Sequence, residues 1–348
     1  MSGPAPAAPV AVSRFMDAQI EMAHGAGGKA TRRLINGLIA PLLMGGTTTL
    51  GDAAMAEIGG AELALTADSF VVRPLQFPGG SIGELAVNGT VNDLAVAGAR
   101  PHTLLVTLVL EAGLRTEILE REMHAMAAAA RRAGVAIAGG DTKVVEHGHA
   151  DGMYVTTAGI GVKDRRASLS AAAVRPGDRI LLSGYIGDHG CTVLLARGGI
   201  ELDASLRSDT RSLWPMVDRL LDAVGPAMRW MRDPTRGGVA TALNELAADT
   251  DLSIAIQDDR VPVRDEVRGV CELLGLDPLH IANEGQLLAV VSPEAAEAAL
   301  AVLRHVDESA TIIGEVRAAP ARTVVAESTY GGARVIDMLV GDPLPRIC

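Results

Sequence analysis

Residues Ile82–Ala97, Ile-Gly-Glu-Leu-Ala-Val-Asn-Gly-Thr-Val-Asn-Asp-Leu-Ala-Val-Ala, place apolar side chains at helical spacing and predict a helix. A second helix is predicted over Thr116–Ala133, because good helix formers end there at Gly134, a frequent residue just beyond a helix C-terminus. Short runs with the composition of strands surround these helices: Leu63–Val72, Leu104–Leu110 and Met153–Ile160. The first half of the chain therefore mixes strands and helices.

The second half repeats this mixture. Strands are predicted at Arg179–Ser183, Leu252–Ile256 and Leu287–Val291, and a helix at Val239–Ala248. Ser292-Pro293-Glu294 is expected to open a further helix, with serine as the N-cap and proline at the first helical position. We predict two α/β (α+β) domains, 18–165 and 166–340, with a disordered Ala/Pro-rich leader at 1–17 and a tail at 341–348.

Composition excludes several functions. The chain of 348 residues carries 31 basic and 42 acidic side chains, a net charge of −11, with only two Trp, three Tyr and three Phe. Such a chain offers neither a positive field for a phosphate backbone nor aromatic platforms for bases, so no nucleic-acid partner is expected. No apolar stretch is long enough to cross a membrane, and no secretory signal is recognised. Three widely spaced cysteines indicate a reducing, cytoplasmic location.

Acidic residues form four clusters in the first half, which we expect in loop-like settings at the ends of elements. Carboxylates gathered in this way are typical ligands of a hard cation such as Mg²⁺, usually together with substrate phosphates. Aspartates that only cap helices or shape turns are the alternative. The four are Asp52, Asp68, Asp93 and Asp141.

Glycine clusters at His24–Lys29, Pro78–Gly80 and Arg236–Gly238 favour phosphate binding, because glycine lets main-chain N–H groups approach an anion. Walker A and Rossmann patterns are absent from the sequence, so a nucleotide would need another architecture. The last segment, Gly341–Cys348, contains two prolines that keep it extended and ends in a thiol. It is either a reactive arm or a frayed terminus.

Taken together, these segments resemble the HypE family of hydrogenase maturation proteins, within the PurM-like ATP-binding superfamily. Ala67 departs from the family pattern, where a second threonine is expected before Asp68. The matching stretches run in the family's order from about residue 18: His24–Gly28, Phe77–Gly83, Asn88–Pro101, Gly139–Lys143, Gly187–Gly190, Met231–Gly238, Ala282–Gly285 and Pro345–Cys348.

The resemblance implies a homodimer in which two N-terminal domains pair into a β-barrel, a flexible C-terminal tail, and the use of ATP with Mg²⁺. It also implies dehydration of a carbamoyl group on Cys348 to S-cyanocysteine. The group would come from the carbamoyltransferase HypF, and the cyanide would pass through the HypC–HypD complex to the iron of [NiFe]-hydrogenase.

The resemblance and the residue chemistry together assign the site. We expect Cys348 to be the reacting thiol, Glu284 to be the base that removes a nitrogen proton rather than a helix or turn cap, and Lys143 to neutralise phosphate charge rather than to be a solvated loop lysine. Ligands of the metal, or of water bound to it, are expected at Asp52, Asp68, Asp93 and Asp141. Nucleotide-binding residues are expected at Gly27, Gly28, Asn92, Arg232, Asp233, Thr235, Arg236, Gly237 and Gly238.

Some residues are interpreted as structural. His24 and His189 lie beside glycines and could line the site, but a lone histidine is more often structural, so both are left out of the catalytic set. Cys191 and Cys271 are expected in helices as small buried residues. The segment Glu146–His149 is interpreted as a surface hairpin turn rather than a metal site.

Two alternatives remain. Another PurM-like ATP-dependent enzyme, such as aminoimidazole ribonucleotide synthetase, selenophosphate synthetase or thiamine-phosphate kinase, would have no use for a terminal thiol. A non-catalytic carrier of that thiol would have no use for the acidic clusters.

Overall fold

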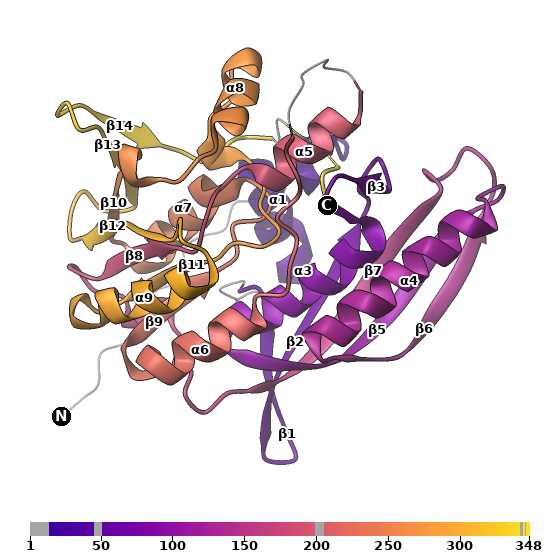
Figure 1. Cartoon of the computed structure of the whole chain (residues 1–348), viewed down its shortest axis with the longest axis horizontal. Helices are drawn as coiled ribbons and strands as arrows, with labels where there is room; N and C mark the ends of the chain where they lie inside the picture. The colour runs from indigo at the N-terminus through magenta and orange to yellow at the C-terminus, as the bar shows by residue number, and fades with distance from the viewer. Residues whose placement is uncertain (1–13, 45–50, 199–204, 342–343, 345) are drawn as a thin grey trace.

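The computed structural model describes residues 14–44, 51–198, 205–341, 344 and 346–348, so most of the predicted leader lies outside the described residues. A first sheet has the strand order β1-β2-β7-β5-β6, in which only β5 and β6 run parallel. Helices α3 and α4 cover one face of this sheet (Figure 1). The bounds are β1 Ala54–Ile58, β2 Ala61–Phe70, β5 Ala99–Glu111, β6 Ala136–Val145, β7 Met153–Lys163, α3 Ile82–Val96 and α4 Thr116–Ala133.

Helix α3 is the core of the first half. Thirteen of its fifteen residues are buried, because β2 and β7 lie on one side and α4 and α6 on others. Close approach to α4 requires glycine at position 83, since a Cβ there would overlap the main-chain oxygen of Glu122. Helix α4 ends, as predicted, at Gly134, which adopts the left-handed conformation with φ of 69°.

A second sheet of seven strands has the order β14-β13-β10-β12-β8-β11-β9. Ile180, Leu182 and Ile254 pack toward α7 on one face, whereas Leu181 and Val291 pack toward α6 and α9 on the other. This alternation follows from the two-residue repeat of a strand. The bounds are β8 Arg179–Leu182, β9 Met228–Arg232, β10 Ser253–Gln257, β11 Leu288–Val291, β12 Thr311–Arg317, β13 Thr323–Glu327, β14 Ala333–Ile336, α6 Trp214–Val224, α7 Gly238–Thr250 and α9 Ala296–Val306.

The remaining elements join the two halves. Helix α5, Asp188–Ala196, packs against α8, Asp265–Leu274, and contacts β3 of the first half. Short elements complete the chain: α1 Lys29–Leu34, α2 Ala40–Leu43, β3 Gln76–Phe77, β4 Gly80–Ser81, the π-helical turn η2 Ile35–Ile39, and the 3₁₀ turns η1 Met22–Gly25, η3 Ala171–Ala173, η4 Gly225–Ala227, η5 Asp258–Arg260, η6 Pro278–His280 and η7 Pro293–Ala295. Among the described helices, none combines the length and the apolar composition needed to cross a bilayer.

Several local predictions were wrong. Asp68 lies within β2, Asp93 within α3 and Asp141 within β6, so three of the four acidic clusters are not in loops. An aspartate resembles a turn residue in sequence, but here neighbouring elements hold each carboxylate inside a regular element.

Two turns also differ from expectation. The helix after Ser292 opens with the 3₁₀ turn η7, and the serine side chain makes no cap hydrogen bond. The turn at Glu146–His149 joins β6 to β7, but it is not a hairpin because β5 lies between those strands.

Candidate active site

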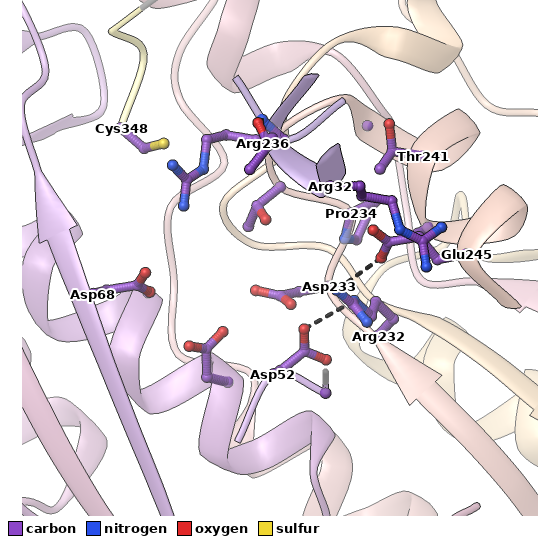
Figure 2. Close-up of a pocket in the computed structure, with 18 of the residues that line it drawn as sticks. Arg32, Asp52, Asp68, Arg232, Asp233, Pro234, Arg236, Thr241, Glu245 and Cys348 are labelled. Atoms are coloured by element: carbon purple, nitrogen blue, oxygen red, sulfur yellow. Dashed lines mark hydrogen bonds and ion pairs between the residues drawn. The ribbon is translucent and has the colours of Figure 1, made fainter. Parts of the chain in front are cut away.

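A cavity of about 500 Å³ lies between the two halves and contains most of the predicted site residues (Figure 2). The first half contributes β2 and α3, the second half contributes the loop after β9 and helix α7, and α1 and the last residue of the chain complete the wall. Predicted residues that line it are Gly27, Asp52, Asp68, Asp93, Arg232, Asp233, Thr235, Arg236, Gly238, Glu284 and Cys348.

Three carboxylates converge at one end of the cavity. Asp52, Asp93 and Asp233 each offer an oxygen, and these oxygens all lie within 4.8 Å of one another. The Thr66 hydroxyl donates to Asp93 Oδ2 at 2.7 Å and so fixes this side chain on α3. Oxygen donors with three negative charges suit a small hard cation such as Mg²⁺. Asp233, assigned from sequence to the nucleotide, thus joins the carboxylate cluster, while Asp68 lines the cavity beside it.

Burial and mutual repulsion set the charge state of this cluster. Burial raises the pKa of Asp233 to about 8 and the pKa of Asp52 to about 6. The pKa of Asp93 also lies well above its ordinary value, because of burial and then the charge of Asp233. Without a cation the cluster therefore holds protons at neutral pH, which a bound cation would displace.

Two arginines supply positive charge to the cavity. Arg232 Nε lies 2.8 Å from Asp52 Oδ1, and its Nη2 lies 2.9 Å from Glu245 Oε2 (Figure 2). Arg236 extends toward Cys348, and charges on Cys348 and then Asp68 raise the pKa of its guanidinium. Arg236 is therefore placed to neutralise an anion between the tail and the carboxylates.

Glu284 has the properties of a buried base. Only 2% of this residue is exposed, and its Oε2 has no hydrogen-bond partner among the described residues. Burial raises its pKa well above the ordinary value, and the charge of Asp233 adds to this shift. Its main-chain oxygen accepts from Asn92 Nδ2 at 3.1 Å. A carboxyl group poised in this way and lining a cavity can exchange a proton with a bound group.

The described part of the tail is docked, with Cys348 at the cavity wall. Val71 N–H donates to the main-chain oxygen of Cys348 at 3.1 Å, and Arg73 N–H donates to the carbonyl of Arg346 at 3.4 Å. Leu344 and Ile347 are buried in an apolar cluster that joins the first half to helices α5 and α8. In Figure 2 the sulfur of Cys348 faces the space between Arg236 and Asp68. The thiol and the acidic cluster thus share one cavity.

Asp141 and Lys143 lie elsewhere in the same chain. Both are exposed on edge strand β6, where Lys143 Nζ lies 2.6 Å from Asp141 Oδ2. The register pairs Asp141 with Thr107 and places it beside Leu105, on the sheet face opposite α3. One chain therefore does not bring these two residues to the carboxylates.

Three further predicted residues shape the site without lining it. Asn92 Nδ2 donates to the carbonyls of Arg211 and Glu284, and its Oδ1 accepts from the N–H of Leu213. The side chain therefore holds the loop that carries Glu284. Gly28 packs against the main-chain oxygen of Leu339. Gly237 is the left-handed residue before α7, with φ of 75°.

The sequence interpretation missed a polar stripe on α7. Thr241, Glu245 and Asp249 are spaced by four residues, share one helix face and line the cavity. Arg32 of α1 lies 3.9 Å from Asp249 Oδ1. The spacing of these polar residues in an otherwise apolar helix was the available signal.

Both halves of the chain match known families. Residues 50–163 match the family described as AIR synthase related protein, N-terminal domain, and residues 175–327 match AIR synthase related protein, C-terminal domain. The fold and the cavity thus define an AIR synthase related, PurM-like protein of two α/β domains.

Similarity to individual proteins identifies the branch of this class to which the chain belongs. The carbamoyl dehydratase HypE of Azotobacter vinelandii is 47% identical over 332 residues, which cover 94% of this chain and 97% of that protein. A crystal structure of the hydrogenase maturation protein HypE in complex with ATP shares 46% identity with a TM-score of 0.79, over 94% of this chain and 99% of that one. A chain from a HypE–HypF complex is 40% identical with a TM-score of 0.81, over 87% and 99%.

The chain belongs to the HypE family of carbamoyl dehydratases, which are hydrogenase maturation proteins. The family predicted from the sequence is confirmed, and so is its nature as an enzyme.

Proposed function

We propose that this enzyme uses ATP to dehydrate a carbamoyl group carried on its own Cys348, yielding S-cyanocysteine. The observation that carries the proposal is that Cys348, Glu284 and the carboxylates line one cavity. A docked tail places the reacting group and the catalytic groups together without a separate binding step.

The chemistry needs a better leaving group than an amide oxygen. The carbamoyl oxygen attacks the γ-phosphorus of ATP, and ADP leaves. Glu284 then takes a nitrogen proton, the C–O bond breaks, phosphate departs, and loss of the second nitrogen proton leaves S–C≡N. One of the two protons ends on phosphate and the other is released, so atoms and charge balance.

The residues present fit Mg²⁺, because three converging aspartates offer the hard oxygen donors that this ion takes. Asp52, Asp93 and Asp233 would hold it, with Asp68 close by. When bound, Mg²⁺ supplies positive charge beside the phosphates. Arg236 neutralises the transferring group from the tail side of the cavity.

Support for the other molecules comes from relatives. A relative crystallised with ATP supports ATP as the co-substrate, and a relative crystallised with HypF supports HypF as the source of the carbamoyl group. We further propose that the cyanide passes to a HypC–HypD complex and then to the iron of [NiFe]-hydrogenase.

We also propose that the enzyme works as a homodimer whose first sheets pair into a barrel. Leu105, Ile160 and Val162 expose 48%, 38% and 46% of their surfaces on the sheet face that α3 and α4 leave uncovered. An exposed apolar face of this kind marks a surface at which another protein chain binds. Asp141 and Lys143 lie on that same face, so pairing would bring them close to the partner chain.

Mass spectrometry of the C-terminal peptide tests the reaction. After incubation with HypF, carbamoyl phosphate, ATP and Mg²⁺, we expect addition of one carbamoyl group followed by loss of one water. Glu284→Gln should stop at the carbamoyl adduct, and Cys348→Ala should show neither change while keeping its fold. An unmodified Cys348 under conditions in which HypF is active would refute the proposal.

A further inference from the structure

The peptide bond just before Cys348 is held by a buried histidine. His189 Nε2, at the start of α5, lies 3.1 Å from the carbonyl oxygen of Ile347. Because a carbonyl oxygen only accepts, Nε2 carries the proton. The other ring nitrogen, Nδ1, lies 2.8 Å from Ser208 Oγ. The hydroxyl can donate to it, since that hydroxyl oxygen already accepts from Thr210 N–H at 3.2 Å.

The ring of His189 is fixed in place on all sides. It is fully buried and meets Phe77 edge to face, with ring centroids 5.5 Å apart. Burial lowers the pKa of His189 to about 4, so the ring stays neutral at physiological pH. A neutral ring with one bound acceptor and one bound donor has a single usable tautomer.

The hydrogen bond from His189 lies directly beside Cys348 in the chain, so it affects where the sulfur is held. Two main-chain oxygens flank the Cα of Cys348: the carbonyl oxygen of Ile347 accepts from His189, and the main-chain oxygen of Cys348 accepts from Val71 N–H. Together these bonds fix the Cα of Cys348 on both sides. The direction of a Cα–Cβ bond follows from the positions of its flanking main-chain groups. The two bonds therefore set the direction in which the Cys348 side chain leaves the main chain, and its sulfur lies at the cavity (Figure 2).

We propose that His189 is a positioning residue that holds the last peptide of the docked tail and so aims the Cys348 sulfur at the cavity. His189 touches no reacting atom and acts through the main chain alone. The catalytic part of this inference rests on the proposed function, whereas the docking part does not.

Two substitutions separate this role from simple packing. His189→Gln keeps a neutral N–H donor near the position of Nε2, and His189→Leu keeps bulk but has no donor. A residue that only fills space would tolerate leucine as well as glutamine. A residue that binds the Ile347 carbonyl would tolerate glutamine alone.

Alkylation of Cys348 by iodoacetamide, read by mass spectrometry, measures docking without any turnover. The full chain is compared without nucleotide and with Mg²⁺ plus a non-hydrolysable ATP analogue. The variants are compared in whichever of these two conditions protects wild-type Cys348 most. There we expect the alkylation rate of Cys348 to rise about ten-fold in His189→Leu, which loses one ordering hydrogen bond. The rate in His189→Gln should stay near that of the wild type. Equal labelling of wild type and His189→Leu would overturn the proposal, as would equally fast labelling of both variants.

Buried Cys191 and Cys271 report on folding in the same experiment, because they react only if the core opens. If they become reactive in His189→Leu, His189→Asn takes its place, since its amide is too short to reach the Ile347 carbonyl. Turnover gives an independent readout: the leucine variant should lower kcat with KM for ATP unchanged. Failure to form S-cyanocysteine in the wild type would remove the proposed function, whereas unchanged labelling would remove only the role of His189.

Discussion

Asp209 holds the loop that carries Glu284: its Oδ1 accepts from the N–H of Glu284 at 3.1 Å, and its Oδ2 accepts from the N–H of Gly285 at 3.1 Å. Burial raises the pKa of Asp209 to about 6, because the charged carboxylate is less stable away from water. The two hydrogen bonds to main-chain N–H groups are therefore made by a carboxylate whose burial is unfavourable. This arrangement fixes where the Glu284 side chain enters the cavity.

Asp209→Asn should therefore slow dehydration without weakening nucleotide binding. The amide keeps one acceptor oxygen, so one of the two N–H groups loses its partner and the Glu284 loop shifts. We expect single-turnover formation of S-cyanocysteine to fall about ten- to a hundred-fold. Calorimetry should show unchanged affinity for Mg·ATP. A normal rate in a folded variant would show that the loop does not need Asp209.

Mixed dimers test where Lys143 acts. A Lys143→Ala chain retains Glu284, and a Glu284→Gln chain retains Lys143. If Lys143 serves the partner's cavity, random mixing of these two inactive proteins restores one intact site in each mixed dimer, about a quarter of all sites. Mixing should restore nothing if Lys143 acts within its own chain. The control mixes two Glu284→Gln preparations with each other, which should restore no activity because no chain in the mixture retains Glu284.

The carboxylate cluster predicts a pH-dependent response to Mg²⁺. A carboxyl group whose pKa is raised by folding holds its proton longer than the unfolded chain does, so its contribution to stability falls as pH rises through that range. Asp233, with a pKa of about 8, makes the metal-free protein less stable at pH 8 than at pH 6. Mg²⁺ displaces those protons, so thermal unfolding should show a larger rise in Tm with Mg²⁺ at pH 8. Asp233→Asn should reduce the difference, and Asp93, whose pKa is also raised, accounts for what remains.

Two neighbouring glycines form a matched pair for a stability test. A Cβ at Gly28 would overlap the main-chain oxygen of Leu339, which accepts from Lys29 N–H at 2.9 Å. A Cβ at Gly25 meets nothing within 4 Å. Gly28→Ala should reduce the free energy of unfolding by about 1–3 kcal/mol, and Gly25→Ala should leave it nearly unchanged in denaturant titrations. Equal effects would contradict the packing seen at Gly28.

Long elements were predictable because local signals agree with the fold. Helix α4 runs from Thr116 to Ala133 as expected, because its helix formers and Gly134 need no tertiary information. Strand β6 was missed because its residues are exposed on both faces of an edge strand, so no apolar alternation marks it.

The site was only partly predictable for a related reason. Asp52, Asp68 and Asp93 were chosen by residue type and family resemblance, and the fold brings them to one cavity. Their grouping with Asp233, and the contact of His189 with the tail, depend on the packing of segments far apart in sequence. A histidine interpreted as structural thus proved to bind the residue next to the thiol.

Burial of Leu344 and Ile347 has a consequence for exchange with other proteins. If partners load and collect the proposed group on Cys348 outside the cavity, both side chains first have to leave the apolar cluster. Exposing two such residues costs roughly 1.5–3 kcal/mol each. The burial of these two aliphatic residues would therefore set the fraction of molecules that expose their thiol, and with it the rate at which the group is transferred.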